Sequence, residues 1–584
     1  MQPREQIIQL VTQALTAAVE SGELVLTEVP EVTLERPRDE GHGDWACTLA
    51  LRLAKQAHMA PRAIADIMVA HITALDAACD QHVVNKVEVA GPGFINFYLN
   101  ASATQSLVAK IRQEGASYGS CQAPEGQEKV LIEYVSANPT GPMHVGHGRW
   151  AALGSATANL LRHAGHEVTE EFYINDQGSQ MNKFGESIAV RYQQQLGRDA
   201  QIPEGGYGGA YVNDIAAEII ARDGDKWLDA DPEERRVEFR EYGYAWVLKL
   251  FKDLCGSFGT NFEVWTSERG LYQSDEAYDG MCAVDWCLEQ LRQKDLVYDA
   301  DGAMWFRSSN YGDDKDRVLK KQDGAYTYFA SDVAYHFLKK KRGFDCLIDI
   351  WGADHHGYVA RVKAVLAAMG YPGALEIMLG QLVNLFRDGE AVRMSKRTGE
   401  MVTFQELVDE VGVDATRFYM LSRSTEQPID FDISVAKKQD SSNPVYYVQY
   451  AHARICSILR NAAGVDYEPG QDMEQVAARA IPAEVDLGRL VHPAELALIR
   501  KMGEFGDLVE KAARDRAPFR LTHYVQEVAS AFHHFYADCS VLKAEDEGLR
   551  DARLALCDAT RILIAVALGI LGISAPVAME HREQ

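Results

Sequence analysis

The sequence lacks three features that would place it in a class at once. Its ten cysteines include no Cys-x-x-Cys pair, so neither a zinc-binding spacing nor a disulfide framework is indicated. Free thiols in a reducing compartment are therefore expected. Residues 1–10 are too polar for a secretory signal. The most apolar run, 562–573, is shorter than the ~20 residues of a membrane helix and is interrupted by Gly569 and Gly572, so it predicts a buried helix.

Basic side chains are also scarce. Lysine and arginine number 59 against 85 acidic residues, which gives a formal net charge of −26. Proteins that bind nucleic acids usually carry a basic footprint, yet even residues 441–584 hold 15 basic against 20 acidic side chains. An RNA partner would therefore have to be held by local basic patches on an acidic body.

The first 120 residues predict a separate α/β module within a chain too long for one core. Apolar side chains from Ile7 to Leu15 have helical spacing, and two strand-like runs, 87–89 and 94–99, flank a Gly/Pro turn. The polar stretch 122–128 predicts a linker to the next part of the chain. Hydrophobic residues make up 47% of the whole, as in ordinary globular proteins.

A doubly wound α/β body is expected next. A short apolar strand at 130–135 leads through a Gly/Pro loop into a helix that starts near Gly146, and later strands are expected at 346–350 and 377–379. Strands that alternate with helices predict a parallel sheet. An insertion rich in Tyr, Gly and charge, at about 175–300, separates the two halves of that sheet.

The C-terminal part predicts helices. Two sets of apolar residues each fall on one helix face, which is typical of core packing: Leu498, Met502, Phe505 and Val509, and Val528, Phe532, Phe535 and Cys539. The expected domains are therefore 1–120, 121–400 with its insertion, a connecting segment at 401–440, and a helical domain at 441–584.

The first motif with chemical character reads Asn-Pro-Thr-Gly-Pro-Met-His-Val-Gly-His at 138–147, between the expected strand and helix. Nucleotides bind at the carboxyl ends of such strands, where the free N–H groups of a helix N-terminus suit phosphate. Gly146 has no side chain, so adenine can pack on the backbone there. His144 and His147 offer hydrogen bonds to phosphate that strengthen in the transition state. An incidental surface loop and a metal-binding histidine pair are the alternatives.

A second motif, Arg-Met-Ser-Lys-Arg-Thr-Gly at 393–399, combines cations with a glycine. Such a run is most often a solvated loop. A lysine that reaches a leaving pyrophosphate, here Lys396, would instead serve adenylate formation as a point charge.

A third motif, Asp354-His355-His356, also fits a metal-dependent phosphoesterase, in which Asp and His share divalent ions and Mn²⁺ binds tightly. Such a site needs further acidic clusters at earlier strand ends. The sequence offers none in that setting.

The first two motifs, in this order and each followed by half of a sheet, resemble the HIGH and KMSK motifs of class I aminoacyl-tRNA synthetases. The resemblance extends over essentially the whole chain to the arginyl-tRNA synthetases. Five stretches carry it: 89–96, 133–147, 312–319, 351–357 and 412–417.

The resemblance implies a Rossmann-like, doubly wound catalytic domain with an insertion, an N-terminal module that contacts tRNA, and an all-α anticodon-binding domain. It implies an arginine–tRNA ligase, which makes arginyl-adenylate from arginine and ATP and transfers arginine to the 3′-terminal adenosine of tRNA. Mg²⁺ would accompany ATP, and no zinc or other resident metal is expected. The resemblance further implies a cytoplasmic monomer without membrane contact, which needs bound tRNA before the adenylate forms.

Arginine recognition fits this family on chemical grounds. A guanidinium is planar, always charged and carries five donors, so its site must supply carboxylates in a fixed plane. By resemblance, Tyr328 and Asp332 face the guanidinium, and their spacing would place both on one side of a helix. Glu133 and Asn138, with His144, would hold the α-amino and carboxylate groups.

The residues that the resemblance assigns to each role form four groups. The catalytic residues are His144, His147 and Lys396. The ATP-binding residues are Pro142, Met143, Gly146, Gly352, Asp354, His355, His356, Met394 and Ser395. The arginine-binding residues are Glu133, Ser136, Asn138, His144, Tyr328 and Asp332. The whole HIGH-like motif comprises Ala137, Asn138, Pro139, Thr140, Gly141, Pro142, Met143, His144, Val145, Gly146 and His147.

The chain departs from the family pattern at three places. Gly352 and Ala353 stand where other arginyl enzymes have a glutamine that helps to bind arginine, so one arginine contact is unassigned. Arg393 replaces the first lysine of the KMSK motif. Residues 580–584 extend beyond Met579, near which relatives end.

RNA contacts are expected on the helical domain. Aromatic rings can stack on unpaired bases, and cations can hold phosphates; the candidates are Tyr446, Tyr447, Tyr450, Arg454 and Arg460. Helix packing is an equal alternative for the tyrosines. Two other functions stay open at this point: a class I synthetase for another amino acid, and a non-catalytic RNA-binding relative.

Overall fold

The computed structural model describes residues 3–37, 40–79, 82–120, 126–392 and 402–579. The chain forms two compact units. The first comprises 1–118, 454–504 and 530–563, and the second comprises 119–453, 505–529 and 564–584. The C-terminal helices therefore contribute residues to both units.

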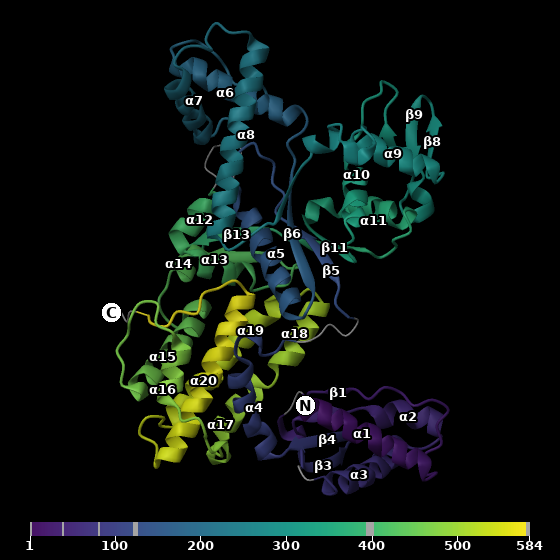
Figure 1. The fold of residues 1–584 in the computed structure, drawn as a ribbon, viewed down its shortest axis with the longest axis vertical. Helices are drawn as coiled ribbons and strands as arrows, with labels where there is room; N and C mark the ends of the chain where they lie inside the picture. The colour runs from purple at the N-terminus through teal and green to yellow at the C-terminus, as the bar shows by residue number, and fades with distance from the viewer. Residues whose placement is uncertain (1–2, 38–39, 80–81, 121–125, 393–401, 580–584) are drawn as a thin grey trace. The chain divides into compact units, whose positions relative to one another are not determined.

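A five-stranded sheet forms the centre of the second unit (Figure 1). Its strand order is β12-β11-β5-β6-β7, and every neighbouring pair is parallel. The strands are β5 (Lys129–Glu133), β6 (Glu167–Ile174), β7 (Val264–Ser267), β11 (Cys346–Gly352) and β12 (Leu375–Gly380). This confirms the doubly wound parallel sheet. The strand order reverses between β5 and β11, where ligands bind in such folds.

Helix α5 (Val145–His163) follows β5, where the sequence predicts it. Fourteen of its residues are buried, because the helix is apolar almost all round and is covered on most sides. Gly154 of α5 lies against the ring of Tyr134, and a Cβ at this position would come within 2.2 Å of that ring. The close packing fixes α5 on the strand that precedes it.

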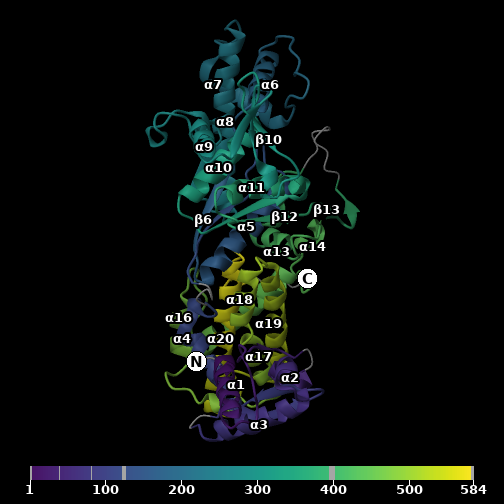
Figure 2. The same ribbon diagram turned by 90° about the vertical axis from the view of Figure 1, so that its right-hand side faces the viewer.

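The region between β6 and β11 holds two groups of elements. The first is a helical group, in which α6 packs against α7 and α8 (Figures 1 and 2); its members are α6 (Ser179–Gln195), α7 (Ala210–Asp223) and α8 (Pro232–Ser257). The second group contains α9 (Ala283–Gln293), the antiparallel strands β8 (Val297–Ala300), β9 (Ala303–Phe306) and β10 (Arg317–Lys320), and α10 (Tyr328–Lys341). Strand β7 lies between the two groups and joins the central sheet. It falls inside the 175–300 range expected as one insertion, and its four half-buried residues carry no apolar run.

Further elements complete this unit. Helix α11 (Val359–Ala368) joins β11 to β12, and a second small sheet has the order β14-β13-β15. Its strands and the neighbouring helices are β13 (Val383–Arg387), β14 (Glu390–Ala391), β15 (Ile429–Asp432), α12 (Phe404–Val411), α13 (Val413–Met420), α14 (Ile433–Ala436) and α18 (Phe505–Arg514). Short 3₁₀ helices are η3 (Arg269–Tyr272), η4 (Glu276–Tyr278), η5 (Ser308–Tyr311) and η6 (Ala353–Tyr358).

The first unit contains an antiparallel sheet of order β1-β2-β4-β3 packed on helices. The elements are α1 (Pro3–Glu20), β1 (Leu34–Glu35), η1 (Glu40–His42), β2 (Trp45–Cys47), α2 (Leu49–Ala57), α3 (Pro61–Ala77), β3 (Val84–Ala90), β4 (Phe94–Leu99), α4 (Ala101–Glu114) and η2 (Gly115–Ser117). Gly93 in the β3–β4 turn has φ +146°, and a Cβ there would lie 2.9 Å from Pro61. The two predicted strands and their turn are confirmed.

Helices from the C-terminal part belong to the same unit as this sheet. Arg112 of α4 pairs with Asp558 at 2.9 Å, and the Tyr118 hydroxyl donates to the Met502 carbonyl at 3.1 Å. The helical elements of the C-terminal part, some of which continue into the second unit, are α15 (Pro444–Ala463), α16 (Met473–Ala480), η7 (Leu487–Arg489), α17 (Pro493–Met502), α19 (Phe519–Asp538) and α20 (Glu547–Ile570).

One helix expected from the sequence is two. Helix α17 ends at Met502 and α18 begins at Phe505, so Leu498 and Val509 do not share one helix. Gly503 caps α17, and its missing side chain leaves room for Leu107, which a Cβ would approach to 3.0 Å. The apolar residues of both predicted sets are nevertheless buried. In the part of the chain that the structure describes, no helix combines the length and apolar character needed to cross a membrane.

Candidate active site

A cavity of about 900 Å³ opens at the carboxyl ends of β5 and β11. The end of β6, helix α10, the 3₁₀ helix η6 and the first turn of α5 contribute the rest of its wall. This is the point where the strand order reverses, as a ligand site in a doubly wound sheet requires.

The turn after β5 is strained. Val135 and Ser136 have φ of 68° and 42°, which place two residues with side chains, one of them β-branched, in the left-handed region. Hydrogen bonds hold this conformation, because the Ser136 hydroxyl donates to Glu133 at 2.9 Å and accepts from the Tyr173 N–H at 3.1 Å. The turn brings residues 135–138 onto the cavity wall.

The two histidines of the HIGH-like motif cap the N-terminus of α5. The His144 N–H donates to Nδ1 of His147 at 3.1 Å, and the two rings stack with centroids 3.7 Å apart. Because Nδ1 of His147 accepts, its Nε2 carries the hydrogen and can donate to an anion. Gly146 makes room for this stack, since a Cβ there would lie 2.9 Å from the His144 ring. A helix N-terminus with adjacent imidazole donors is suited to bind phosphate.

Helix α7 and helix α6 support the loop that precedes these histidines. The Tyr211 hydroxyl donates to the Thr140 carbonyl at 2.7 Å, and the Asn138 amide donates to Gln180 at 3.3 Å. Tyr211 also lies against Gly141, where a Cβ would come within 2.6 Å of its hydroxyl. The helical insertion therefore holds the loop in place.

Four carboxylates from different elements meet at the cavity: Glu133 of β5, Glu268 after β7, Asp332 of α10 and Asp349 of β11. Burial raises the pKa of Glu268 to about 7, although the Ser331 hydroxyl, which donates to it at 3.1 Å, acts in the opposite direction. Burial also raises the pKa of Asp332, whose carboxylate accepts a hydrogen bond from Tyr358. Four acids gathered in one cavity favour a cationic ligand, because a cation stabilises their ionised forms.

Two basic side chains of α10 face these acids from behind. The fully buried Lys339 ammonium donates to Glu133 and to Asp349, the latter at 2.8 Å, and His336 contacts Asp349 at 2.8 Å. Neither Lys339 nor His336 forms a side-chain hydrogen bond with the carboxylates of Glu268 and Asp332. Those two carboxylates accept hydrogen bonds from the hydroxyls of Ser331 and Tyr358, respectively.

The other end of the cavity is formed by η6 and the end of β11. Asp354 and His355 line it and are exposed, with 3.5 Å between carboxylate and imidazole. Gly352 and Ala353 also line the cavity. Within the described ranges, no group of three or more His, Cys, Asp or Glu side chains could hold a metal ion.

The structure brings most of the predicted residues together. Those that line the cavity are Glu133, Ser136, Ala137, Asn138, His144, Gly146, His147, Tyr328, Asp332, Gly352, Asp354 and His355. Those that lie in the adjoining loop, helix and 3₁₀ turn, outside the lining, are Pro139, Thr140, Gly141, Pro142, Met143, Val145 and His356. Arg393, Met394, Ser395 and Lys396 lie outside the described residues.

The sequence analysis does not predict several residues that line the cavity or lie directly behind it. Glu268 sits in a polar segment without periodicity and gave no signal. Asp349 could have been found, because it is a charged residue inside the apolar run of β11. Lys339 and His336 follow Asp332 at helical spacing on α10, so that the three share one helix face.

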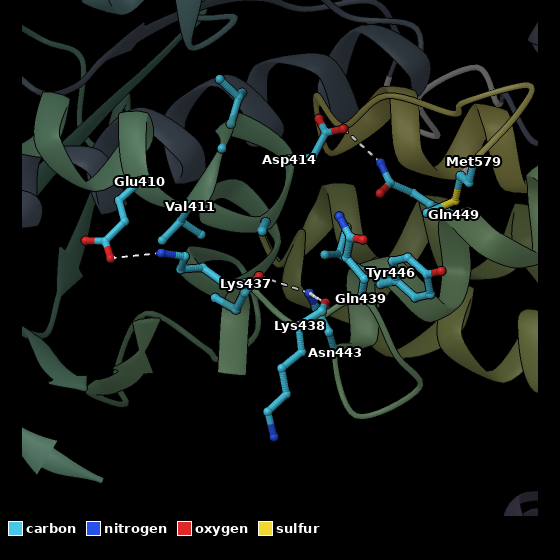
Figure 3. Close-up of a pocket in the computed structure, with 15 residues that line it drawn as sticks. Glu410, Val411, Asp414, Lys437, Lys438, Gln439, Asn443, Tyr446, Gln449 and Met579 are labelled. Atoms are coloured by element: carbon cyan, nitrogen blue, oxygen red, sulfur yellow. Dashed lines mark hydrogen bonds and ion pairs between the residues drawn. The ribbon is translucent and has the colours of Figure 1, made fainter. Parts of the chain in front are cut away.

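A second cavity of about 690 Å³ lies where α12, α13 and α14 meet α15 (Figure 3). Tyr446, Gln449, Lys438 and Met579 are among its lining residues. Tyr446 stacks on Tyr450 with ring centroids 6.1 Å apart.

The remaining residues that the sequence assigned to RNA lie elsewhere on α15. Arg454 lies over the Tyr536 ring at 4.5 Å. Arg460 is buried and lies 5.4 Å from the Tyr467 ring centroid, as a packing residue does. Tyr447 is partly buried.

Comparisons with known protein families match three successive parts of the chain. An arginyl tRNA synthetase N-terminal domain matches residues 5–99, a class I tRNA synthetase (R) catalytic domain matches 108–431, and a DALR anticodon binding domain matches 448–579. Two curated relatives are the arginine–tRNA ligases of Geobacillus thermodenitrificans, 45% identical over 99% of both chains, and of Bacillus subtilis, 43% identical over 98% of this chain and 99% of the relative.

Solved structures show the same fold. The arginyl-tRNA synthetase of Thermus thermophilus superposes with a TM-score of 0.72 at 23% identity, over 99% of this chain and 100% of that one. The arginyl-tRNA synthetase of Plasmodium falciparum gives a TM-score of 0.69 at 15% identity, over 99% of both chains.

Proposed function

The chain belongs to the arginyl-tRNA synthetase family, and from that premise we propose how its cavity joins arginine to tRNA. The activity itself is that of an ATP-dependent arginine–tRNA ligase with a class I catalytic domain. Class membership brings ATP, arginine and tRNA as substrates, and the roles of individual residues are the content of the proposal.

The carboxylates of the cavity bind the arginine guanidinium. Asp332 and Glu268 accept its N–H donors, because they carry buried negative charge and their present partners are hydroxyls. Tyr328, exposed on the first turn of α10, closes over the side chain. The meeting of four acids in one cavity, three of them buried, is the observation that carries this assignment.

The strained turn and the HIGH-like loop hold the main-chain end of arginine. Asn138, Ser136 and His144 lie along one wall of the cavity, between the acids and the N-terminus of α5. Glu133 lies below them with both carboxylate oxygens already bonded, one to Ser136 and the other to Lys339. Glu133 therefore shapes the floor on which the α-amino group rests.

ATP lies with its phosphates at the N-terminus of α5. His144 and His147 donate to phosphate oxygens, Gly146 packs under the adenine, and Met143 and Pro142 hold the loop around it. Gly352, Asp354, His355 and His356 bind the nucleoside, and we assign Met394 and Ser395 of the KMSK-like segment to ATP binding as well. Mg²⁺ enters with ATP as part of the co-substrate.

The reaction takes two steps. The arginine carboxylate attacks the α-phosphorus of ATP, the bond to the β-phosphate oxygen breaks, and pyrophosphate leaves with the charge stabilised by Lys396. The terminal ribose 2′-hydroxyl of tRNA then attacks the carbonyl of arginyl-adenylate and expels AMP. Positioning and electrostatic stabilisation supply the rate, and the enzyme forms no covalent intermediate.

The chain reads tRNA at two further places. We assign residues 1–120 to the tRNA-contacting N-terminal module, 121–400 to catalysis, 401–440 to a connection and 441–584 to anticodon binding. On the last of these, Tyr446, Tyr447, Tyr450 and Arg454 are placed to stack on bases or hold phosphates, whereas the burial of Arg460 favours packing. The family resemblance supports a cytoplasmic monomer.

ATP–pyrophosphate exchange tests this proposal. We expect exchange with arginine when the tRNA that accepts arginine is present, and none with lysine or citrulline. Exchange without tRNA would show that the site is assembled in the free enzyme and would remove tRNA from the first step. Exchange with lysine in place of arginine would refute the guanidinium site, and a lack of exchange with any amino acid would leave only a non-catalytic RNA-binding role.

A further inference from the structure

Lys339 is the one fully buried lysine side chain among the largest buried residues of the described chain. It lies on α10, seven residues after Asp332, and does not line the cavity. Its ammonium donates to the carboxylates of Glu133 and Asp349, and its third side faces the Tyr335 ring, whose centroid is 4.4 Å away. Both of these hydrogen bonds thus go to the two acids that form the cavity floor.

His336 completes the arrangement from the same helix. Its Nδ1 faces the Asp332 carbonyl at 2.8 Å, and its Nε2 faces the second oxygen of Asp349 at 2.8 Å. Both partners are acceptors, so an imidazolium that donates from both nitrogens satisfies the contacts. Asp349 is then held at both oxygens, one by Lys339 and one by His336.

Glu133 and Asp349 need such a cation. They are directly paired across the neighbouring parallel strands, Glu133 at the end of β5 and Asp349 in the middle of β11. Two buried carboxylates this close do not both stay ionised without a positive charge between them, and one takes a proton instead. Burial of the two acids and the lysine costs free energy, and an apolar set of the same size is often at least as stable. Stability alone therefore does not account for the trio.

We infer that Lys339 is a positioning residue for arginine: its ammonium fixes Glu133 and Asp349 as an immobile, neutralised floor, so that the free negative charge of the cavity lies at Asp332 and Glu268. Lys339 acts through the two carboxylates and never touches the substrate. The inference rests on the proposed arginine site.

The charges around the trio agree with this role. Burial acts to lower the pKa of Lys339, but Asp349, Glu133 and Glu171 together raise it above its ordinary value. Burial opposes the ionisation of Asp349, and Lys339 with His336 nevertheless lowers its pKa to about 2. Burial raises the pKa of Glu133, against the pull of Lys339. Glu133 is therefore the acid that takes up a proton when the ammonium is lost.

The test is Lys339→Met in the full chain, which keeps the length of the side chain and removes its charge. We measure KM and kcat by ATP–pyrophosphate exchange in the presence of tRNA, and the thermal midpoint of the same samples. A positioning role raises the KM for arginine about tenfold or more and leaves the KM for ATP within about twofold. A purely structural role lowers the midpoint and kcat without a selective change in the KM for arginine, and this result would overturn the inference.

Lys340→Met is the matched control on the neighbouring residue. Its ammonium binds the carbonyls of Phe344 and Asp345 at the end of the helix, away from the cavity, so both KM values stay unchanged. The double variant Glu133→Gln/Lys339→Met tests the route of the effect. If Lys339 acts through the charge of Glu133, the double variant raises the KM for arginine no further than the larger single change, whereas additive effects contradict the inference.

Two further variants keep the outcome decisive. If Lys339→Met does not fold, the double variant Asp349→Asn/Lys339→Met replaces it, because it removes both buried charges together. Glu133 is still left without its cation in this variant, so the KM for arginine rises as well. An unchanged KM for arginine overturns the inference. Asp332→Asn runs in parallel as the variant of a direct contact. A loss of arginine use in Asp332→Asn with none in the Lys339 variants rejects this inference alone, whereas unaltered arginine use in Asp332→Asn rejects the arginine site itself.

Discussion

The Arg149 side chain offers a direct test of how the catalytic body is held together. It is 1% exposed on α5, two residues beyond His147, and its guanidinium binds backbone carbonyls of two separate segments. It donates to Gln381 at 2.6 Å, and to Ser424 and Gln427 at 2.9 Å and 2.8 Å. Burial lowers the pKa of Arg149 to about 10. Arg149→Met removes these donors, after which the Ser424 carbonyl keeps the Gln427 N–H, at 3.1 Å, as a donor.

The magnitude follows from opposing effects. Each hydrogen bond from a charged donor contributes about 1.5–3 kcal/mol to the stability of the folded enzyme. The three short bonds of Arg149 together contribute more than one such bond does. The substitution also removes the desolvation cost of the buried cation, on the order of several kcal/mol, and this partly offsets the loss. The net loss is about 1–3 kcal/mol, as expected where neutral polar groups lose a hydrogen-bond partner. For a unit of this size we expect the thermal midpoint to fall by roughly 2–6 °C.

The assay follows the thermal midpoint together with the KM for ATP. Gln381 and its neighbour Leu382 line the active-site cavity, so the KM for ATP rises in Arg149→Met along with the loss of stability. Arg149→Lys gives an intermediate midpoint, because a point charge cannot span carbonyls of both segments. A midpoint of Arg149→Met within about 1 °C of the unchanged chain would refute this reasoning, since no buried network of that strength could then exist.

Three further predictions concern the site itself. The pKa of Glu268 is raised to about 7, and a bound guanidinium favours the ionised carboxylate. The affinity for arginine therefore rises about tenfold per pH unit as the pH approaches 7 from below, and it levels off above pH 7. Calorimetric titration at several pH values measures this dependence, and we expect Glu268→Gln to show none. An equally flat profile for the unchanged chain would contradict it. Tyr211→Phe removes the hydrogen bond to Thr140, so kcat/KM in the exchange assay falls about fivefold with an unchanged thermal midpoint; a shift in midpoint alone would speak for packing. Lys396→Ala lowers kcat for exchange by about 10²–10³ and leaves arginine binding intact, and a rise in the arginine Kd instead would remove Lys396 from pyrophosphate stabilisation.

The sequence predicted the framework of the site because local patterns encode it. The apolar strand before 138–147 and the helix after it place His144 and His147 at a strand-to-helix junction, and the structure has β5 and α5 there. The i, i+4 spacing of Tyr328 and Asp332 likewise falls on α10.

The rest of the site depends on tertiary contacts that no local pattern carries. Glu268 reaches the cavity because β7 joins the edge of the sheet, and that strand is too short and too polar to be recognised. The function of Lys339 depends on two partners from distant strands, so its helix position alone suggests only an amphipathic face. Helix α17 ends at Met502 because of Gly503, although the helical spacing of apolar residues continues past this point. The spacing alone therefore does not predict the break.

Calorimetric titration of arginine and of citrulline into the unchanged chain tests the central claim, that buried carboxylates select a guanidinium. Citrulline has nearly the same shape without the charge, so only the electrostatic contribution differs between the two ligands. The account predicts that arginine binds at least about 100-fold more tightly than citrulline, and that Asp332→Asn removes most of this difference. Equal affinities for arginine and citrulline, or an unchanged preference in Asp332→Asn, would contradict it.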